Sequence, residues 1–396
     1  MRAYFEHNLS RREFLQRSLI AGGVLFTGFD RLPLPAIAAA PADDPFRGGR
    51  MLGLAAFTGE APVPMGAAFG KELDGRLYTD LSQLTPESRV TPAEKFYIRT
   101  RASELLPNAQ SWMVRLGGLV ARPGEIPAAE LRREARPMGL RLMECAGNVH
   151  AVHFGLMSAG KWAGVPVAEI LARARAKPQA TRVLVSGFDR YATPSVSSVP
   201  GASWVFTLNE LESAGAFLAT ELDGAPLARD HGAPLRLVAP GWYGCACIKW
   251  VNEITLVDDS RGATSQMREY ASRTMQDGVP QMAKDYKPAV VDQAAMPIRV
   301  EKWLVSGKIK YRVVGILWGG NRPVKKLEIR FNPEEDYVPV DWFHQPANDP
   351  WSLWAHPWTP RQPGEYLIRL RVAEPRVVAR RLDAGFYVRA VEIGEV

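Results

Sequence analysis

Short apolar segments separated by polar turns run through most of the chain, and their spacing changes near residue 295. From residue 95 to about 257, the alternation of strands is mixed with the three- and four-residue spacing of helices. Strands are predicted at residues 95–100, 111–120, 181–189 and 234–242, and helices at residues 166–176 and 207–220. Because these segments are short and broken by Gly and Pro, the pattern favours an α+β fold over a doubly wound sheet.

Beyond residue 295 the alternation is strand-like almost throughout, with turn residues between the segments. The predicted strands lie at residues 309–320, 324–332, 350–358 and 364–374. They predict an all-β sandwich of about 100 residues. The expected organisation is an α+β domain at residues 95–285 and a β domain at residues 295–396, preceded by an irregular Gly- and Pro-rich arm at residues 39–94.

The first 38 residues have the pattern of a twin-arginine signal peptide. Arg11 and Arg12 precede a short apolar run, and small residues at Ala36 and Ala38 offer a cleavage site. The alternative is the start of an amphipathic helix in a cytosolic protein. No stretch is apolar for about 18 uninterrupted residues, so no membrane span is predicted. The twin-arginine route carries folded proteins to the periplasm, which favours a cofactor inserted before export.

Composition adds two exclusions. The chain is 46% hydrophobic and carries a formal net charge of +7 without a block of basic residues, so nucleic-acid binding is not predicted. The three cysteines are Cys145, Cys245 and Cys247. None belongs to a C-x-x-C-H motif, so no haem is expected to be attached to this chain, and three free thiols are expected.

The stretch "RLMECAGNVHAVHF" at residues 141–154 carries the most informative chemistry. Cys145 could be a buried structural thiol, or a nucleophile with His150 or His153 as its base. It could also share a zinc ion with both histidines, although their spacing is unusual for zinc. The stretch by itself leaves these alternatives open.

Several motifs in order resemble the sulfite oxidase family of molybdopterin-dependent oxidoreductases. "ECAGN" is followed by "GKWAGVPVAEIL" at residues 160–171, and "FYIRT" precedes it at residues 96–100. "GFDR" at residues 187–190 and the long segment "LDGAPLARDHGAPLRLVAPGWYGCACIKWVNEI" at residues 222–254 continue the similarity. "MREY" at residues 267–270 places a tyrosine where the family has one in its pocket. The resemblance covers about residues 90–390.

The resemblance implies a cofactor and a set of site residues. Cys145 would be the thiolate ligand of molybdenum, which suits a metal otherwise bound by the sulfurs of molybdopterin. The residues expected to bind the cofactor are Arg99, Cys145, Asp189, His231, Arg236, Gly244 and Lys249. The residues expected to be catalytic are Cys145, Tyr270, Arg99 and His150. The C-terminal region would be the family's immunoglobulin-like domain, through which a homodimer is expected.

The implied reaction is two-electron oxygen-atom transfer, most directly the oxidation of sulfite or a related sulfur compound. Without a haem in the chain, electrons would pass to a separate c-type cytochrome or haem subunit. The alternatives are a reductase of a sulfoxide or oxyanion, and a non-catalytic binding module. The chain departs from the family after "CAGN", where Val149 and His150 replace a basic pair. "MECAGN" and "PWSLWAHPW" resemble the sulfane dehydrogenase branch, whose substrate is a protein-bound sulfur.

Overall fold

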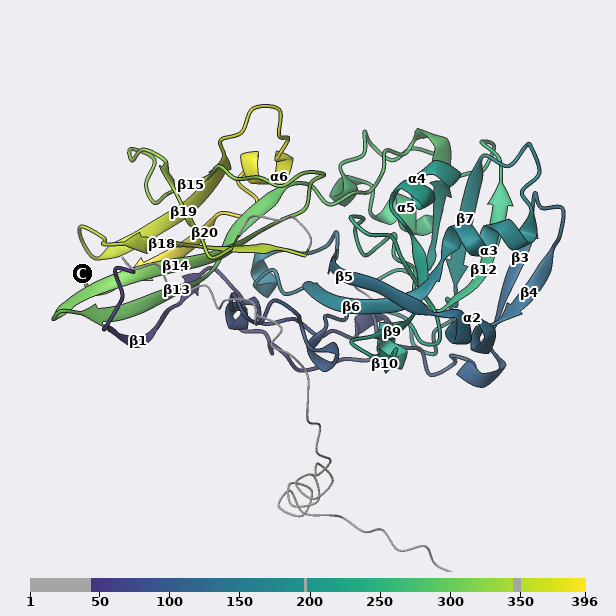
Figure 1. Cartoon of the computed structure of the whole chain (residues 1–396), viewed down its shortest axis with the longest axis horizontal. Helices are drawn as coiled ribbons and strands as arrows, with labels where there is room; N and C mark the ends of the chain where they lie inside the picture. The colour runs from purple at the N-terminus through teal and green to yellow at the C-terminus, as the bar shows by residue number, and fades with distance from the viewer. Residues whose placement is uncertain (1–43, 196–197, 345–349) are drawn as a thin grey trace, which may run out of the picture. The chain divides into compact units, whose positions relative to one another are not determined.

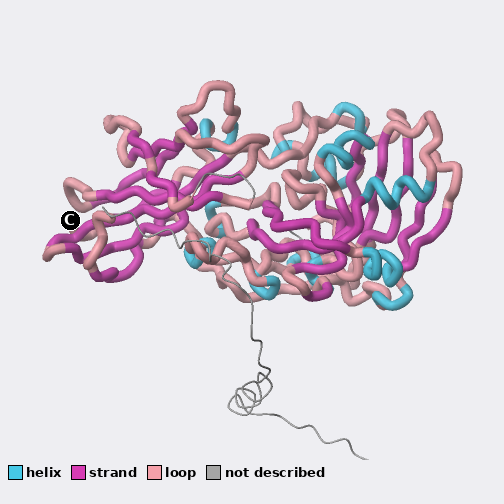
Figure 2. Tube along the Cα trace, viewed as in Figure 1, coloured by secondary structure: helices cyan, strands magenta, loops and turns pink. Residues whose placement is uncertain are grey.

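A computed structural model describes residues 44–195, 198–344 and 350–396 of the chain. These residues form four five-stranded sheets and a few short helices. The chain divides into two units, at residues 1–47 and 48–396. In the first, residues 44–47 form a turn in which the Arg47 amide donates to the Asp44 carbonyl at 3.0 Å. The predicted signal peptide lies outside the described residues. Figure 2 shows the small share of helix in the second unit.

Two of the sheets lie in the predicted α+β part. One has the order β10-β9-β6-β5 with β11 paired to β9, and the other has the order β4-β3-β12-β7-β8. All pairings in these sheets are antiparallel except β3 with β12. Their bounds are β3 Met113–Gly118, β4 Gly124–Pro127, β5 Arg136–Glu144, β6 Met157–Pro166, β7 Arg182–Gly187, β8 Ser203–Thr207, β9 Phe217–Leu222, β10 Ala225–Pro226, β11 Arg236–Val238 and β12 Val251–Val257.

The helices are short, which makes the α+β part mostly sheet. They are α2 Ala128–Glu134, α3 Val167–Ala174, α4 Leu208–Ser213, α5 Ser265–Glu269 and α6 Arg380–Asp383. Eight single 3₁₀ turns connect other segments, at Glu72–Asp74, Leu81–Gln83, Ala93–Lys95, Ala109–Ser111, His150–Val152, Arg229–His231, Ser272–Thr274 and Ala283–Asp285. Among the described residues, no helix has the length and apolar composition needed to cross a bilayer.

The sequence predicted some of these elements and missed others. The strand predictions at residues 111–120 and 181–189 are confirmed by β3 and β7, and the helix at residues 166–176 by α3. The helix predicted at residues 207–220 is half wrong. A Thr207–Glu210 capping box starts α4, but Gly215 with φ +61° ends it. The following apolar run becomes β9, buried between β6 and β11.

The strand predicted at residues 95–100 is also wrong. Phe96, Tyr97 and Ile98 are buried, but the segment forms a single isolated bridge, between Leu77 and Ile98. Its neighbours are turns of the N-terminal arm rather than strands, so no ladder can form. The extended backbone instead delivers Arg99 to a cavity described below.

The C-terminal part consists of two antiparallel sheets. Their orders are β1-β13-β14-β18-β17 and β16-β15-β19-β20-β2. The bounds are β13 Ala294–Val305, β14 Lys308–Trp318, β15 Leu327–Arg330, β16 Val338–Pro339, β17 Asp341–Trp342, β18 Ser352–Trp358, β19 Gly364–Val372 and β20 Arg389–Ile393. Gly315 of β14 faces Trp354 of β18, and a Cβ there would meet the indole at 2.1 Å, so the close approach needs glycine.

The N-terminal arm is less irregular than predicted. β1 (Arg50–Ala55) pairs with β13, and β2 (Phe57–Thr58) pairs with β20, so the arm supplies an edge strand to each C-terminal sheet. Figure 1 shows β1 in purple beside the green strand β13. The alternation of "RMLGLA" is short and preceded by glycines, so its partner could be found only in the folded chain.

Two apolar cores follow from this arrangement. One fills the space around the two sheets of the α+β part, and the other lies between the C-terminal sheets. Three aromatic residues of the C-terminal part, Trp318, Trp351 and Tyr387, belong to the first core. The C-terminal part is thus packed against the loop that follows β5, where Cys145 lies.

Candidate active site

A cavity opens between the two sheets of the α+β part, and it encloses about 960 Å³ with its open mouth included. Its lining comes mainly from residues 97–100, 189–191, 198–202, 244–250 and 265–270. All nine residues predicted for the site from sequence can be placed relative to this cavity. Those on its wall are Arg99, Cys145, Asp189, Arg236, Gly244, Lys249 and Tyr270, and those away from it are His150 and His231.

Cys145 directly follows the last residue of β5 and is 4% exposed. Its amide donates to the Leu156 carbonyl at 2.9 Å, and its own carbonyl accepts from the Asn148 amide at 2.9 Å. The Gly147 amide lies 3.3 Å from Sγ. Burial raises the pKa of the Cys145 thiol, while Arg99 and the Gly147 amide favour the thiolate. The loop therefore holds one sulfur firmly at the cavity wall.

Cys245 and Cys247 lie on the same wall and are buried. The prediction of three free thiols is confirmed. Burial raises the pKa of both thiols, which makes them poor nucleophiles. Among the described residues, no three His, Cys, Asp or Glu side chains gather as a metal site, so the zinc alternative for Cys145 finds no support.

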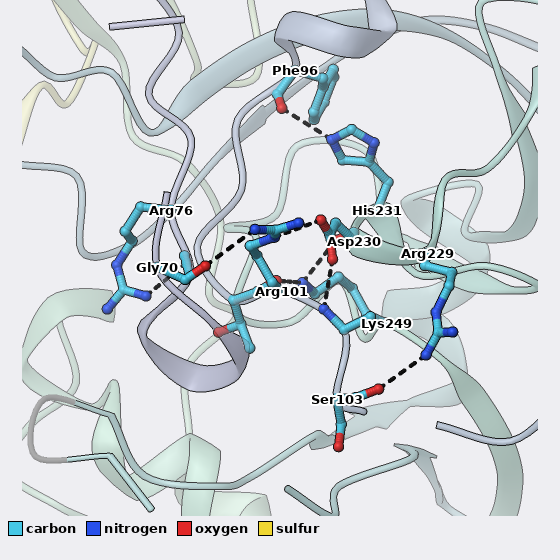
Figure 3. Close-up of polar contacts among 12 residues, drawn as sticks. Gly70, Arg76, Phe96, Arg101, Ser103, Arg229, Asp230, His231 and Lys249 are labelled. Carbon is cyan, nitrogen blue, oxygen red and sulfur yellow. Dashed lines mark hydrogen bonds and ion pairs between the residues drawn. The ribbon is translucent and has the colours of Figure 1, made fainter. Parts of the chain in front are cut away.

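Three cations line the cavity, Arg99, Arg236 and Lys249. Arg99 Nη1 donates to Ser198 Oγ at 2.9 Å. Lys249 Nζ donates to the Asp230 carbonyl at 3.0 Å and to the Thr100 carbonyl, and burial lowers the pKa of Lys249. Figure 3 shows Lys249 and Arg101 both reaching Asp230, with the Arg101 Nε atom 2.9 Å from the Asp230 carboxylate. Within the described part of the chain, the Lys249 ammonium thus has carbonyl partners and no carboxylate partner of its own.

Arg236 is 5% exposed and has incomplete partners. Its Nη2 lies 2.7 Å from Met143 Sδ and its Nη1 lies 3.4 Å from the His231 carbonyl. Its Nε is buried and has no partner among the described residues. Asp189, on the opposite loop, likewise has a buried Oδ1 for which the described residues offer no partner. Burial raises the pKa of Asp189, although the amides of Gly201 and Ala202 oppose this. Unpaired polar atoms of this kind in a cavity wall indicate a polar ligand.

Gly244 and His231 support the wall in different ways. A Cβ at Gly244 would meet Tyr97 Oη at 2.4 Å, so glycine allows the loop to lie against the Tyr97 segment. His231 is not on the wall. Its Nε2 lies 3.0 Å from the Phe96 carbonyl, and burial lowers the pKa of His231 to about 4, so the ring is neutral near pH 7. The neutral ring fixes the segment that carries Arg99 (Figure 3).

His150 is not brought to the cavity, although it was predicted to be catalytic. The turn His150–Val152 is followed by His153 and Phe154 with φ of 54° and 53°, which directs the segment toward the arm. His153 Nδ1 lies 2.9 Å from Glu60 Oε2, and His150 Nε2 lies 3.8 Å from Glu60 Oε1. Neither histidine has Cys145 among its contacts, so the structure does not support the nucleophile–base alternative.

Three neighbouring groups were missed by the sequence analysis. Glu60 pairs with Arg389 of β20, both buried. Glu144, immediately before Cys145, accepts from Trp318 Nε1 at 2.9 Å and from Tyr387 Oη at 2.9 Å. Arg273 lies three residues after Tyr270 and beside Gly147. Only Arg273 had a local signal, its closeness in sequence to Tyr270, since the partners of Glu60 and Glu144 lie far away in the chain.

Comparisons with known proteins agree with this geometry. Residues 103–265 match the family described as "Oxidoreductase molybdopterin binding domain". The chain is 26% identical to the mitochondrial sulfite oxidase of Homo sapiens over 268 residues, which is 62% of this chain and 48% of that protein. It is 24% identical to the sulfite oxidase of Arabidopsis thaliana over 291 residues, 66% of this chain and 72% of that protein.

Two further relatives extend the comparison. The nitrate reductase [NADPH] of Fusarium oxysporum is 24% identical over 302 residues, 65% of this chain and 32% of that protein. The chain therefore spans about a third of that enzyme and about half of the human one. Among solved structures, the sulfane dehydrogenase SoxCD from Paracoccus pantotrophus matches with a TM-score of 0.62 and 18% identity, over 92% of this chain and 96% of that chain. That match shows a shared fold.

Proposed function

We propose a function from one premise: this chain belongs to the sulfite oxidase family of molybdopterin-dependent oxidoreductases. The proposed reaction is the oxidation of sulfite or a related sulfur compound by two-electron oxygen-atom transfer. The proposed setting is the periplasm, with electrons passed to a separate c-type cytochrome. The molybdopterin-binding oxidoreductase domain is the established part, and the substrate, direction, setting and partner are inferred.

The cavity suits molybdopterin. Asp189 Oδ1 is an unpaired acceptor and Arg236 Nε an unpaired donor, as the N–H groups and the phosphate of the cofactor require. Lys249 adds a partly buried cation that has no carboxylate partner among the described residues, and Gly244 lets the backbone approach closely. Cys145 offers a soft sulfur ligand at the same wall. The donor set therefore matches the group.

In this assignment Cys145 would ligate molybdenum, Asp189 would accept from the pterin, and Arg236 and Lys249 would hold the phosphate. When bound, the cofactor supplies two-electron oxygen-atom transfer. Arg99 attracts an anionic substrate, and Tyr270 offers a hydroxyl donor to the reacting group. Burial raises the pKa of Tyr270, so its proton stays on the phenol oxygen at neutral pH.

One observation carries the choice of an anionic substrate. Arg99 lies at the cavity wall with Cys145 and favours the charged form of its thiol, and it donates a hydrogen bond to the neutral Ser198 hydroxyl. A guanidinium without a carboxylate partner, next to the candidate metal ligand, attracts an anion such as sulfite. The same cation would also attract nitrate. The nitrate reductase relatives therefore keep reduction of an oxyanion as the second candidate.

The test is anaerobic stopped-flow spectroscopy of the molybdenum-loaded protein. Mixing with about 1 mM sulfite, the upper end of ordinary KM values, is expected to bleach the oxidised absorption, and oxidised cytochrome c should restore it. In the reverse direction, viologen-reduced protein is mixed with nitrate or a sulfoxide. Oxidation by nitrate or sulfoxide without reduction by sulfite would replace the proposed function with the reductase. Thiosulfate serves as a third donor and tests for a sulfane substrate.

A further inference from the structure

Glu72 of the N-terminal arm is a buried carboxylate that joins two distant segments of the chain. It is 3% exposed and lies in a 3₁₀ turn. Its Oε1 atom accepts from Ser103 Oγ at 3.0 Å, from the Glu104 amide at 3.0 Å and from the Ala192 amide at 3.1 Å. Its Oε2 atom accepts from the Thr193 amide at 2.8 Å and from the Thr193 hydroxyl at 2.7 Å. We call this set of hydrogen bonds the Glu72 bridge.

Both segments of the Glu72 bridge lead into the wall of the cofactor cavity. Residues 103–104 come shortly after the stretch that carries Arg99, and residues 192–193 come shortly after Asp189. The side chains of Arg99 and Asp189 line the cavity, whereas Glu72 does not. Glu72 therefore acts on the cavity through the backbone that carries these two residues.

Two more side chains of the same stretch of the arm contact the same two segments. Asp74 Oδ1 accepts from Ser195 Oγ at 2.6 Å. Arg76 Nη1 donates to the Arg99 carbonyl at 2.7 Å. Arg76 Nη2 lies 3.4 Å from Ser198 Oγ, which also accepts from Arg99 Nη1 at 2.9 Å. The arm thus holds each segment at more than one point.

The Glu72 bridge requires an ionised carboxylate. Burial raises the pKa of Glu72, but the hydrogen bonds from Thr193, Ala192 and Glu104 outweigh this and lower the pKa to about 2. An ionised carboxylate only accepts, and every partner in the bridge is an N–H or O–H donor. The φ of Glu72 is 46°, a left-handed conformation that is uncommon outside glycine and persists where the surroundings determine it.

We propose that Glu72 is a positioning residue of the cofactor site, which ties the Asp189 loop (residues 189–195) to the segment after Arg99 and so keeps molybdopterin enclosed between them. The inference goes beyond the proposed function, because it concerns retention of the cofactor and not the substrate or the direction of the reaction. Wall segments open locally when few contacts hold them, and the bridge opposes this opening. The N-terminal arm is then part of the cofactor site.

The test measures how fast the molybdenum-loaded protein loses its cofactor. The protein is diluted and filtered at intervals, and elemental analysis gives the molybdenum that is still bound. The Glu72→Gln substitution keeps the size of the side chain but turns an NH₂ group toward N–H and O–H donors. Release should become about 10- to 100-fold faster, the usual worth of a hydrogen bond to a charged group.

Glu87→Gln is the matched control. Glu87 is an exposed residue of the same arm, so the substitution removes the same charge without breaking the bridge. Its release rate should stay within about twofold of that of the unchanged protein.

Thr193→Val is a milder variant that keeps the shape of the side chain and removes one donor of the bridge. Release from it should be about threefold faster. In the double variant Glu72→Gln/Thr193→Val, release should differ from that of Glu72→Gln by less than about twofold, because the two groups act through one contact. Effects that multiply in full would contradict the bridge.

Hydrogen exchange separates positioning from a general loss of stability. In the loaded Glu72→Gln protein, the amides of Glu104, Ala192 and Thr193 should exchange faster, while those of β7 keep their protection. Mass spectrometry of the corresponding peptides measures this. An equal loss of protection in β7 would mean that Glu72 supports the fold as a whole, and the positioning role would be overturned.

The outcomes also separate this inference from the proposed function. If sulfite fails to reduce the protein but Glu72→Gln speeds the release of molybdenum, the proposed function fails and the Glu72 bridge stands. If sulfite reduces the protein, and Glu72→Gln and Thr193→Val both release molybdenum as slowly as the unchanged protein, the role of Glu72 is overturned and the proposed function stands.

Discussion

The segment that follows β5 has two ends with opposite electrostatics. At one end, Cys145 shares a cavity wall with cations that pair with no carboxylate of the described residues, and Asp189 and Arg236 keep buried polar atoms without partners there. At the other end, about eight residues later, His153 packs into a cluster in which Glu60 meets Arg389. The first end is called open here because its cations lack carboxylate partners, and the second is called closed because Glu60 pairs with Arg389. The closed end still lines a second cavity, and among the described residues Arg389 Nε is buried there without a partner.

The difference separates a ligand site from a structural site. A buried charge without a partner is costly, so a protein keeps one where a ligand will complete it. In the closed cluster the two oxygens of Glu60 have partners, and the Arg389 guanidinium also donates to the Pro297 carbonyl at 2.9 Å and covers the Phe57 ring at 3.7 Å. His150 and His153, although they are close to Cys145 in sequence, therefore belong to the cluster around Glu60 and not to the cavity.

The largest effect is expected at the open end. Replacing Cys145 with Ser exchanges the soft sulfur ligand for a weaker oxygen donor, and turnover should fall by more than about 100-fold, beyond what the loss of a supporting hydrogen bond costs a metal site. The fold should persist, because Ser is nearly isosteric. Activity, molybdenum content and the circular dichroism spectrum check this. Ordinary turnover in the variant would exclude Cys145 as the ligand.

At the closed end, the Glu60→Gln substitution should lower the stability of the fold. Burial lowers the pKa of Arg389 to about 10 although Glu60 opposes this, so Arg389 is still charged near neutral pH and would lose its carboxylate. The free energy of unfolding should fall by roughly 3–5 kcal/mol, measured by urea denaturation. Glu365→Gln, on the exposed part of β19, is the control and should change it by less than about 0.5 kcal/mol. Equal losses in both variants would refute the closed cluster.

His231, which lies behind the cavity wall, is expected to make the stability of the fold depend on pH. Its pKa falls from 6.5 to about 4 on folding because the ring is buried. Between pH 6.5 and 4 the ring is therefore protonated in the unfolded chain and neutral in the folded protein. The free energy of unfolding consequently decreases as the pH falls from 6.5 toward 4. The loss is on the order of 3 kcal/mol.

The His231→Gln variant tests this slope. Glutamine can still donate to the Phe96 carbonyl but does not titrate, so the pH dependence of the unfolding free energy should flatten between pH 6.5 and 4 relative to the unchanged protein. An unaltered slope would mean that His231 is not the group responsible.

The smallest effect is expected for His150→Asn. The His150 ring is partly exposed and lies 3.8 Å from Glu60 Oε1, beyond hydrogen-bonding distance. Its loss should change the unfolding free energy by less than about 0.5 kcal/mol and leave the sulfite kinetics unchanged. A clear rise in KM for sulfite would return His150 to the substrate site and weaken the contrast between the two ends.

Local patterns predicted the parts of the molecule that depend on neighbouring residues. The alternation at residues 111–120 and 181–189 predicted β3 and β7, and the ordered motifs from "FYIRT" to "MREY" predicted a family and a cofactor. These signals are local because side-chain alternation and turn chemistry act over a few residues. The apolar run after Gly215 was mistaken for helix, since a short apolar run fits either element until its neighbours are known.

The sequence by itself determined that Cys145 stands in a molybdopterin-binding segment and that basic residues accompany it. Only the tertiary structure decided that Arg99 and Tyr270 reach the cavity and that His150 does not, and that Arg273 lies beside Gly147. The reason is physical. Whether a charge is matched depends on partners such as Glu60 and Arg389, which lie 329 residues apart in the chain, and no local pattern records such a pairing.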